Sequence, residues 1–237
     1  MERRRGGGQK SVTHPWQRTR GPRCICVVSC LPLLAKQWQL TSVVVAMTLA
    51  PTPRRSLSLT VYCASSRRVP QHYLDVATEL GRLIAVRGHT LVYGGGNTGL
   101  MGALATAALA HQGRVRGVIL TEFIDRGYAT VGHEMHSVND MRLRKRGLDE
   151  FGDAYIALPG GFGTLEEILE MISFKQLGLH HKPVVLINTN DYFAGLLLQF
   201  ERGFAEAFMH ERCRDLYTVV ADPYEALAYI EACVDAG

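Results

Sequence analysis

The stretch that decides the fold is Leu158-Pro159-Gly160-Gly161-Phe162-Gly163-Thr164-Leu165-Glu166-Glu167. It follows the apolar run 154–158, which is typical of a buried strand, and it precedes apolar residues at helical spacing, namely Leu165, Ile168, Leu169, Met171 and Ile172. A strand, a glycine turn and a helix start together leave backbone N–H groups facing one point, where the helix dipole also favours an anion. We therefore predict a phosphate site, with the carboxylate of Glu167 one turn inside the helix.

Glu167 has a second interpretation. Thr164-x-x-Glu167 fits a capping box, in which both side chains only close the helix N-terminus. On this motif alone the capping box is the better explanation of Glu167. It does not require the glycines before it, however, whereas a phosphate does benefit from backbone without Cβ atoms at Gly160, Gly161 and Gly163.

Short apolar runs alternate with helical patterns from about residue 58 to the C-terminus. The apolar runs predict strands at 59–64, 90–93, 115–120, 134–138, 154–158, 183–187 and 217–220. Besides the helix after the glycine turn, we predict helices at 70–84, 100–110, 140–151, 192–208 and 223–234, with a loop at 121–132. Strands that alternate with helices imply βαβ units. The expected fold is α/β, a single Rossmann-like, doubly wound domain over residues 56–237, with a mostly parallel sheet and helices on both faces.

A second glycine-rich segment follows the second predicted strand, and it contains Gly94, Gly95 and Gly96. With Gly99 it fits G-x-G-x-x-G, which alone is a weak sign of a dinucleotide-dependent oxidoreductase. Ligands of open parallel sheets bind at the carboxyl ends of strands, so this segment, 65–66 and 159–164 are candidate ligand loops. Two glycine loops at neighbouring strand ends suit a mononucleotide better than a dinucleotide. No Gly-Lys pair is present, which excludes a P-loop.

The densest basic cluster after the first 55 residues is Asp140-Met141-Arg142-Leu143-Arg144-Lys145-Arg146. A solvated helix face would explain it. Arg144, however, would lie near the start of a helix, where the dipole disfavours cations unless an anion neutralises them. Because the guanidinium fork suits phosphate or carboxylate, both interpretations remain open.

The first 55 residues differ in composition from the rest. They contain 10 Lys and Arg and one acidic residue, a net charge of +9, whereas residues 56–237 contain 16 Lys and Arg and 21 Asp and Glu, a net charge of −5. Such an extension packs no core. We interpret it as a transit peptide, as a secretory signal with a poor cleavage site, or as disordered or mis-assigned sequence upstream of a true start at Met47. The mildly acidic remainder predicts no nucleic-acid partner, and no uninterrupted apolar run predicts a membrane span.

Cysteine, histidine and lysine positions exclude several classes of site. The six cysteines show no disulfide framework, so we expect a reducing compartment, with Cys63 as a core residue. His133-x-x-His136 and His180-His181 lack a convincing third ligand, so no metal is expected. A pyridoxal-phosphate decarboxylase would need a Schiff-base lysine, and none of the three lysines after residue 55 has such a setting: Lys145, Lys175 and Lys182.

Three motifs together resemble the LONELY GUY family of cytokinin riboside 5′-monophosphate phosphoribohydrolases, many of which carry the label lysine decarboxylase. They are Pro159-Gly160-Gly161-x-Gly163-Thr164-x-x-Glu167, Met141-x-x-Arg144-Lys145 and Tyr93-Gly94-Gly95-Gly96-x-x-Gly99-Leu100-Met101-Gly102. The resemblance covers residues 58–235. It implies hydrolysis of the N-glycosidic bond of a cytokinin nucleotide or of AMP, which releases free base and ribose 5-phosphate. It also implies a cytoplasmic homodimer that needs no cofactor, in which helix 100–110 could supply a packing surface.

The resemblance also implies roles for individual residues. Arg144 and Glu167 would be the catalytic pair. The substrate would be bound by residues of the three motifs and by Ser173, namely Gly94, Gly95, Gly96, Lys145, Gly160, Gly161, Phe162, Gly163, Thr164, Leu165, Glu166 and Ser173. Two positions depart from the family pattern: Arg142 replaces the usual His, and Ser173 replaces a common Thr. Neither change removes a catalytic group, and both could alter selectivity for the base.

A carboxylate suits this chemistry, because departure of the base leaves positive charge on the ribose that Glu167 could stabilise while it activates water. We expect Arg144 to keep Glu167 ionised by lowering its pKa. The alternative is a carrier of a nucleotide or cofactor without catalysis, which would not need the Arg144–Glu167 pair.

Overall fold

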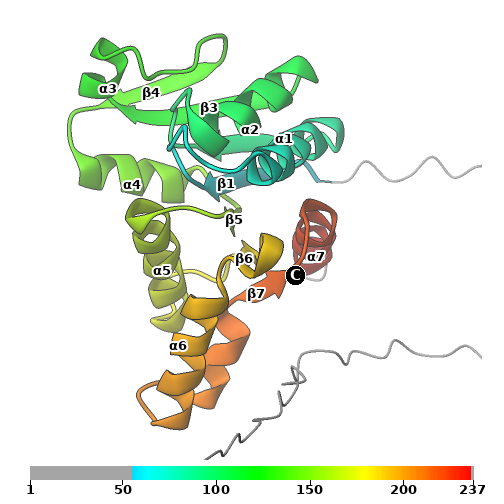
Figure 1. The fold of residues 1–237 in the computed structure, drawn as a ribbon, viewed down its shortest axis with the longest axis vertical. Helices are drawn as coiled ribbons and strands as arrows, with labels where there is room; N and C mark the ends of the chain where they lie inside the picture. The colour runs from blue at the N-terminus through cyan, green and yellow to red at the C-terminus, as the bar shows by residue number, and fades with distance from the viewer. Residues whose placement is uncertain (1–54, 236–237) are drawn as a thin grey trace, which may run out of the picture. The chain divides into compact units, whose positions relative to one another are not determined.

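A parallel sheet of seven strands runs through residues 55–235, the part of the chain that this computed structural model describes (Figure 1). The strands are β1 (Ser58–Tyr62), β2 (Thr90–Tyr93), β3 (Arg114–Leu120), β4 (Glu134–Val138), β5 (Ala154–Ala157), β6 (Val184–Ile187) and β7 (Thr218–Val220). They lie in the order β4-β3-β2-β1-β5-β6-β7, and every neighbouring pair is parallel. The predicted doubly wound sheet is confirmed.

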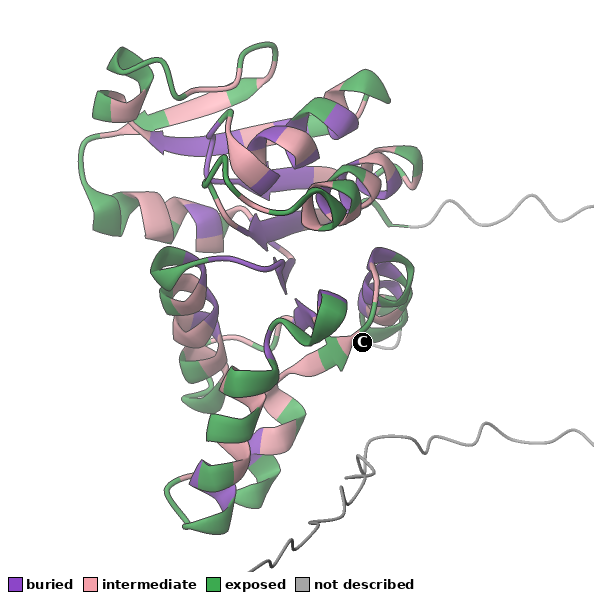
Figure 2. Cartoon of the chain, viewed as in Figure 1, coloured by how far each residue is buried: buried purple, intermediate pink, exposed green. Residues whose placement is uncertain are grey.

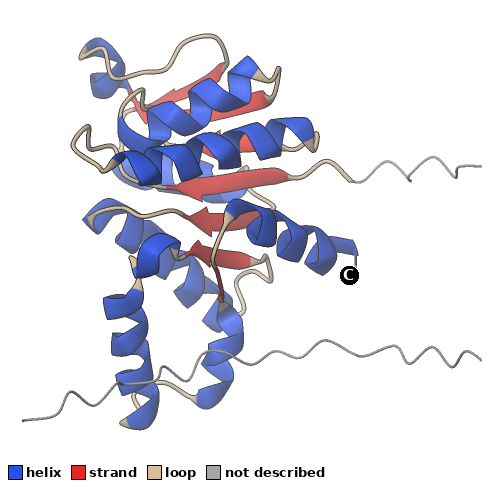
Figure 3. Cartoon of the chain, turned by 45° about the vertical axis from the view of Figure 1, so that its right-hand side comes forward, coloured by secondary structure: helices blue, strands red, loops and turns tan. Residues whose placement is uncertain are grey.

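Helices cover both faces of this sheet (Figure 3). One apolar cluster joins the sheet to α1 (Gln71–Val86), α2 (Gly99–Ala110) and α7 (Pro223–Asp235). The other joins it to α4 (Met141–Glu150), α5 (Phe162–Gln176) and α6 (Ala194–Ala205). Two boundaries differ from the prediction. The expected loop 121–132 begins with a short helix, α3 (Thr121–Asp125). The expected helix 192–208 is shorter, α6 (Ala194–Ala205), and the 3-10 turn η1 (Thr189–Asp191) precedes it.

Burial follows the position of each strand in the sheet (Figure 2). All residues of β5 and β6 are buried, whereas the edge strands β4 and β7 are partly exposed. Strands covered on both faces need apolar side chains on both sides, which explains the continuous apolar runs. The small residues of α2 also belong to the packed interior, because Gly102, Ala105 and Ala108 are buried within this chain.

The chain reverses its direction of winding between β1 and β5. From β1 it proceeds through β2 and β3 to one edge, and from β5 it proceeds through β6 to the other. Such a switch point opens a crevice at the carboxyl ends of the strands, where ligands bind. Because β1 separates β2 from β5, the two glycine loops do not follow neighbouring strands, and that expectation was wrong.

The interpretations of the basic extension concern residues 1–55, and all of these but Arg55 lie outside the described residues, as do the three cysteines of the extension. In the described range, Cys63 and Cys213 are buried free thiols and Cys233 is an exposed one. The burial of Cys63 confirms it as a core residue. No helix between residues 55 and 235 combines the length and the apolar character needed to cross a bilayer.

Candidate active site

Arg144 and Glu167 meet at the carboxyl edge of the sheet. Asp140 caps the N-terminus of helix α4, where its carboxylate accepts hydrogen bonds from Arg142 N at 2.8 Å and Leu143 N at 3.2 Å. This cap places Arg144 near the start of the helix, as predicted. Its Nη1 donates to Oε1 of Glu167 at 2.8 Å, and the two side chains are only 12% and 14% exposed. The structure therefore joins two residues from separate motifs in one buried ion pair.

The glycines after β2 make room for that pair. A Cβ atom on Gly94 would overlap the Arg144 guanidinium, whose Nη2 lies 3.4 Å from the Gly94 carbonyl oxygen. Gly95 has a φ of +77° and packs against Ile119, and Gly96 packs against Met101. These three glycines therefore border the site. Their close contacts with other residues of the protein are enough to explain why none of them carries a side chain.

The N-terminus of α5 has no side-chain cap. Its N-cap residue is Gly161, and Thr164 is the third residue of the helix. The capping-box interpretation of Thr164 and Glu167 was therefore wrong, because Thr164 does not occupy the cap position and Glu167 is bonded to Arg144. No residue between 55 and 235 accepts a hydrogen bond from the backbone N–H groups of 161–164. Free N–H groups at a helix start are a ready site for an anion.

Burial raises the pKa of Glu167 above its ordinary value, and the nearby Arg144 only partly offsets this rise. Arg144 lowers this pKa, as expected, but the loss of water on burial outweighs the guanidinium, so the net shift is upward. Burial also raises the pKa of Cys63, and the charge of Glu167 adds to that effect.

Lys145 is held by α5. Its Nζ lies 2.5 Å from Glu166 Oε1 and 3.0 Å from Glu170 Oε1, and these hydrogen bonds raise its pKa. Glu170 was not predicted, although its spacing from Glu166 places both on one helix face. Three further predicted residues have other surroundings: Phe162 is 93% exposed, Leu165 packs against the core, and the Ser173 hydroxyl donates to the Leu169 carbonyl.

Three histidines and one lysine elsewhere have partners within the protein. His136 bonds to Glu134 at 2.7 Å, His133 to Tyr93 at 3.3 Å, and His180 to the Met171 carbonyl at 2.8 Å. Among the described residues, no three His, Cys, Asp or Glu side chains converge as metal ligands would. Lys182 bonds to Asp149 and Tyr155, which fix it away from the glycine loops.

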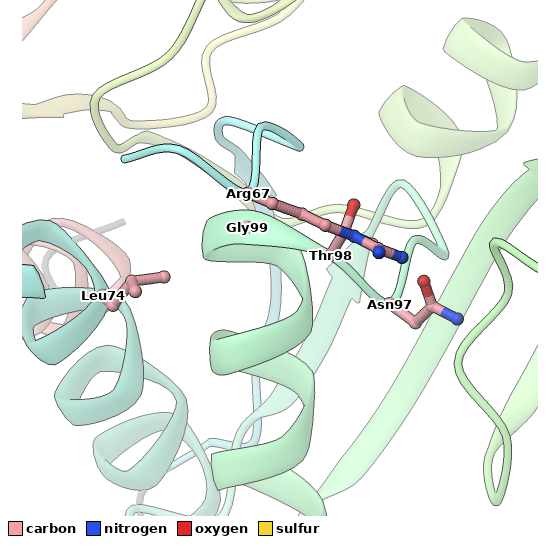
Figure 4. Close-up of a pocket in the computed structure, with 5 residues that line it drawn as sticks. All are labelled: Arg67, Leu74, Asn97, Thr98 and Gly99. Atoms are coloured by element: carbon pink, nitrogen blue, oxygen red, sulfur yellow. The ribbon is translucent and has the colours of Figure 1, made fainter. Parts of the chain in front are cut away.

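A shallow hollow of about 380 Å³ opens at the same edge of the sheet (Figure 4). It is lined by Arg67, Leu74, Asn97, Thr98 and Gly99, and the Arg67 side chain extends across it toward Asn97. Neither Arg144 nor Glu167 lines it. The hollow therefore does not contain the predicted catalytic pair.

Tyr192 is a site residue that sequence reasoning missed. It precedes α6, and its hydroxyl donates to the carbonyl oxygen of Gly160 at 2.7 Å. No motif contains it, and 32 residues separate the two partners. Only the pairing of β5 with β6 brings them together, and a single sequence does not display that contact.

Comparison with known proteins agrees with these features. Residues 101–230 match the family described as "Possible lysine decarboxylase". A cytokinin riboside 5′-monophosphate phosphoribohydrolase of Rhodococcoides fascians is 42% identical over 186 residues, which cover 77% of this chain and 91% of that protein. A probable enzyme of the same name from Oryza sativa subsp. japonica is 40% identical over 193 residues, with 81% and 76% covered.

The chain belongs to the LONELY GUY family. The predicted resemblance is thereby confirmed. Solved structures agree on the fold: the molybdenum cofactor binding protein of Rippkaea orientalis has a TM-score of 0.60 at 21% identity, covering 76% of this chain and 98% of that one. The Moco carrier protein of Chlamydomonas reinhardtii has a TM-score of 0.59 at 21% identity, with 77% and 100% covered. At this identity the likeness concerns the fold alone.

Proposed function

We propose that this LONELY GUY protein hydrolyses the N-glycosidic bond of a cytokinin riboside 5′-monophosphate or of AMP, releasing free base and ribose 5-phosphate. The observation that carries the proposal is the buried Arg144–Glu167 pair, placed one turn from four free N–H groups. The relatives named as phosphoribohydrolases support the same reaction. A pure carrier of nucleotides would not need this pair.

In the proposed reaction the 5′-phosphate binds at the N–H groups of residues 161–164, which places the ribose beside Glu167. Departure of the base leaves positive charge on the sugar, and the carboxylate stabilises that charge and orients the attacking water. Water adds a hydroxyl to C1′, and its other proton goes to the base. Arg144 holds the carboxylate in place. Its buried Nε has no acceptor among the described residues, so the guanidinium keeps a donor free for substrate.

The test is base release from AMP and from isopentenyladenosine 5′-monophosphate by the wild type and by Glu167→Gln. We expect release by the wild type and a loss of at least 100-fold in kcat for the variant, since the substitution keeps the shape but removes the charge. Glu150→Gln is the matched control, because Glu150 is an exposed carboxylate that pairs only with Arg146. The substrate that is hydrolysed better shows whether the enzyme prefers plain or isoprenoid-modified adenine nucleotides. Nucleotide binding without release from either would instead establish the carrier.

We also propose that the protein is a cytoplasmic homodimer. Several large apolar side chains support a subunit contact because they are mostly exposed, namely Phe162, Leu177, Leu179, Leu198 and Phe208. Helix α2 offers less, since most of its apolar residues pack within the chain. Sedimentation equilibrium would give the mass in solution, and a monomer would contradict the proposal.

A further inference from the structure

We propose that Tyr192 is a positioning residue for the phosphate-binding loop, fixing the direction of the Gly161 N–H group through the carbonyl of Gly160. This inference rests on the proposed phosphate site. It starts from one hydrogen bond, in which the Tyr192 hydroxyl donates to Gly160 O at 2.7 Å. Tyr192 lies outside every motif of the sequence and does not touch the Arg144–Glu167 pair.

The Gly160–Gly161 peptide plane links the Tyr192 hydrogen bond to the Gly161 N–H group. A trans peptide is planar, so the C=O of one residue and the N–H of the next point in opposite directions. The described chain contains no cis peptide bond. The bond from Tyr192 to the Gly160 carbonyl therefore turns the Gly161 N–H away from Tyr192. This N–H is one of the four that have no acceptor among residues 55–235.

The peptide planes on either side of Gly160–Gly161 are also fixed by hydrogen bonds to their carbonyl groups. The Pro159 carbonyl accepts from Ala64 N at 3.2 Å, and the Gly161 carbonyl accepts from Leu165 N at 3.0 Å. Three successive carbonyls are thus held by three elements: the β1–α1 loop, the turn before α6, and the first turn of α5. Of these three bonds, only the one to Gly160 comes from a side chain. It is therefore the one that a substitution can remove while the backbone stays intact.

The turn that places Tyr192 has a strained backbone. Asn190 and Asp191 precede it with φ of 51° and 55°, in the left-handed region that non-glycine residues rarely adopt. Anchors on both sides enforce this turn: Asn188 N donates to Val220 O at 2.8 Å, and Asn188 Oδ1 accepts from Phe193 N at 2.8 Å. Phe193 is itself 1% exposed. Backbone strain that the surrounding structure enforces is found at functional sites. Here the strained turn determines the position of Tyr192.

Tyr73 provides a matched comparison. Its ring meets the Tyr192 ring edge-on at 5.7 Å, and it comes from α1 on the other side of the loop. No described residue bonds to its hydroxyl. Tyr73→Phe therefore removes the same atom as Tyr192→Phe from the same aromatic pair, without touching Gly160.

The experiment measures calorimetric binding of AMP and of adenosine, together with kcat and KM for AMP, for the wild type and both variants. For Tyr192→Phe we expect AMP affinity to fall and KM to rise about tenfold, because one phosphate donor is misdirected. Adenosine has no phosphate, so its affinity should stay within twofold, as should kcat and the thermal midpoint. Tyr73→Phe should match the wild type in every measurement.

Two results would overturn this role. Unchanged AMP affinity in Tyr192→Phe would show that the hydroxyl does not orient the loop. Equal losses for AMP and adenosine, or a lowered thermal midpoint, would show a general structural role instead. A wild type that binds AMP but releases base from neither AMP nor isopentenyladenosine 5′-monophosphate would contradict the proposed hydrolysis. The binding comparison would stay valid, so the two failures are distinguishable.

Discussion

The two glycine-rich loops at the carboxyl edge of the sheet need their glycines for different reasons. In the loop after β2, a Cβ on Gly94 would overlap Arg144, and a Cβ on Gly99 would lie 2.5 Å from the Ser66 carbonyl oxygen. In the loop after β5, a Cβ on Gly160 would overlap the Thr164 side chain, but a Cβ on Gly161 or Gly163 would meet no atom within 4 Å. The first loop is therefore glycine-rich because of the protein's own packing. The second has open space that the protein does not use, which is what a ligand site requires.

The largest effect is expected for Gly99→Ala in the first loop. Gly99 has a φ of +59°, and the three atoms nearest to an added Cβ belong to the backbone of residues 64–66. We expect the free energy of unfolding to fall by about 3 kcal/mol or more, measured by urea denaturation. Gly127→Ala is the control, since Gly127 has a φ of +74° but open space around it, and should lose only about 1–2 kcal/mol. Equal losses would contradict the packing explanation.

Gly94→Ala should affect activity more than stability. The obstructing atom is the end of a flexible side chain, so Arg144 can move aside, but it then leaves Glu167. We expect kcat for AMP hydrolysis to fall by about 100-fold, as misplaced catalytic groups do, while the protein stays folded. Steady-state kinetics and circular dichroism would check this. An activity near that of the wild type would show that the close approach of Gly94 and Arg144 is not needed.

Gly163→Ala tests the second loop and should separate stability from binding. Alanine at this open helical position should raise the free energy of unfolding by about 0.5–1 kcal/mol. We expect the KM for AMP to rise about tenfold all the same, because the methyl group would occupy space meant for phosphate. Gly195→Ala is a matched control: Gly195 is also the second residue of a helix with open space around it. It should stabilise the protein equally and leave KM unchanged.

The smallest expected effect is a shift in pH dependence. Burial raises the pKa of Glu167, so activity that needs its carboxylate should be lost, as the pH falls, at a higher pH than an ordinary glutamate with a pKa of about 4.3 would give. Bound phosphate adds negative charge and raises this pKa further. The acid limb of kcat, which reports the substrate complex, should therefore lie at higher pH than that of kcat/KM. Profiles from pH 4 to 9 would show it, and coincident limbs would place the phosphate far from Glu167.

Sequence reasoning predicted the features that local patterns and motifs encode. Alternating apolar runs and helical patterns predicted the parallel sheet, and the motifs identified the family. The errors came from contacts between distant segments. The capping box of Thr164 and Glu167 was a sound local interpretation, but Arg144 on another helix binds Glu167 instead. The net pKa of Glu167 depends on burial that only the folded chain creates. Tyr192 and Glu170 reach the site through pairings that their own neighbours in sequence do not reveal. The roles of the individual site residues remain predictions.

The central strand β1 has a consequence for synthesis of the chain. Because β1 is the first of the described strands to be made and pairs with both β2 and β5, one of its edges stays open until the ribosome has added about a hundred more residues, when Leu59 pairs with Ala154. Arg144 emerges before this event and Glu167 after it. A nascent chain therefore has no ion pair until the two halves of the sheet have joined, and the onset of base release during translation would report the moment of that closure.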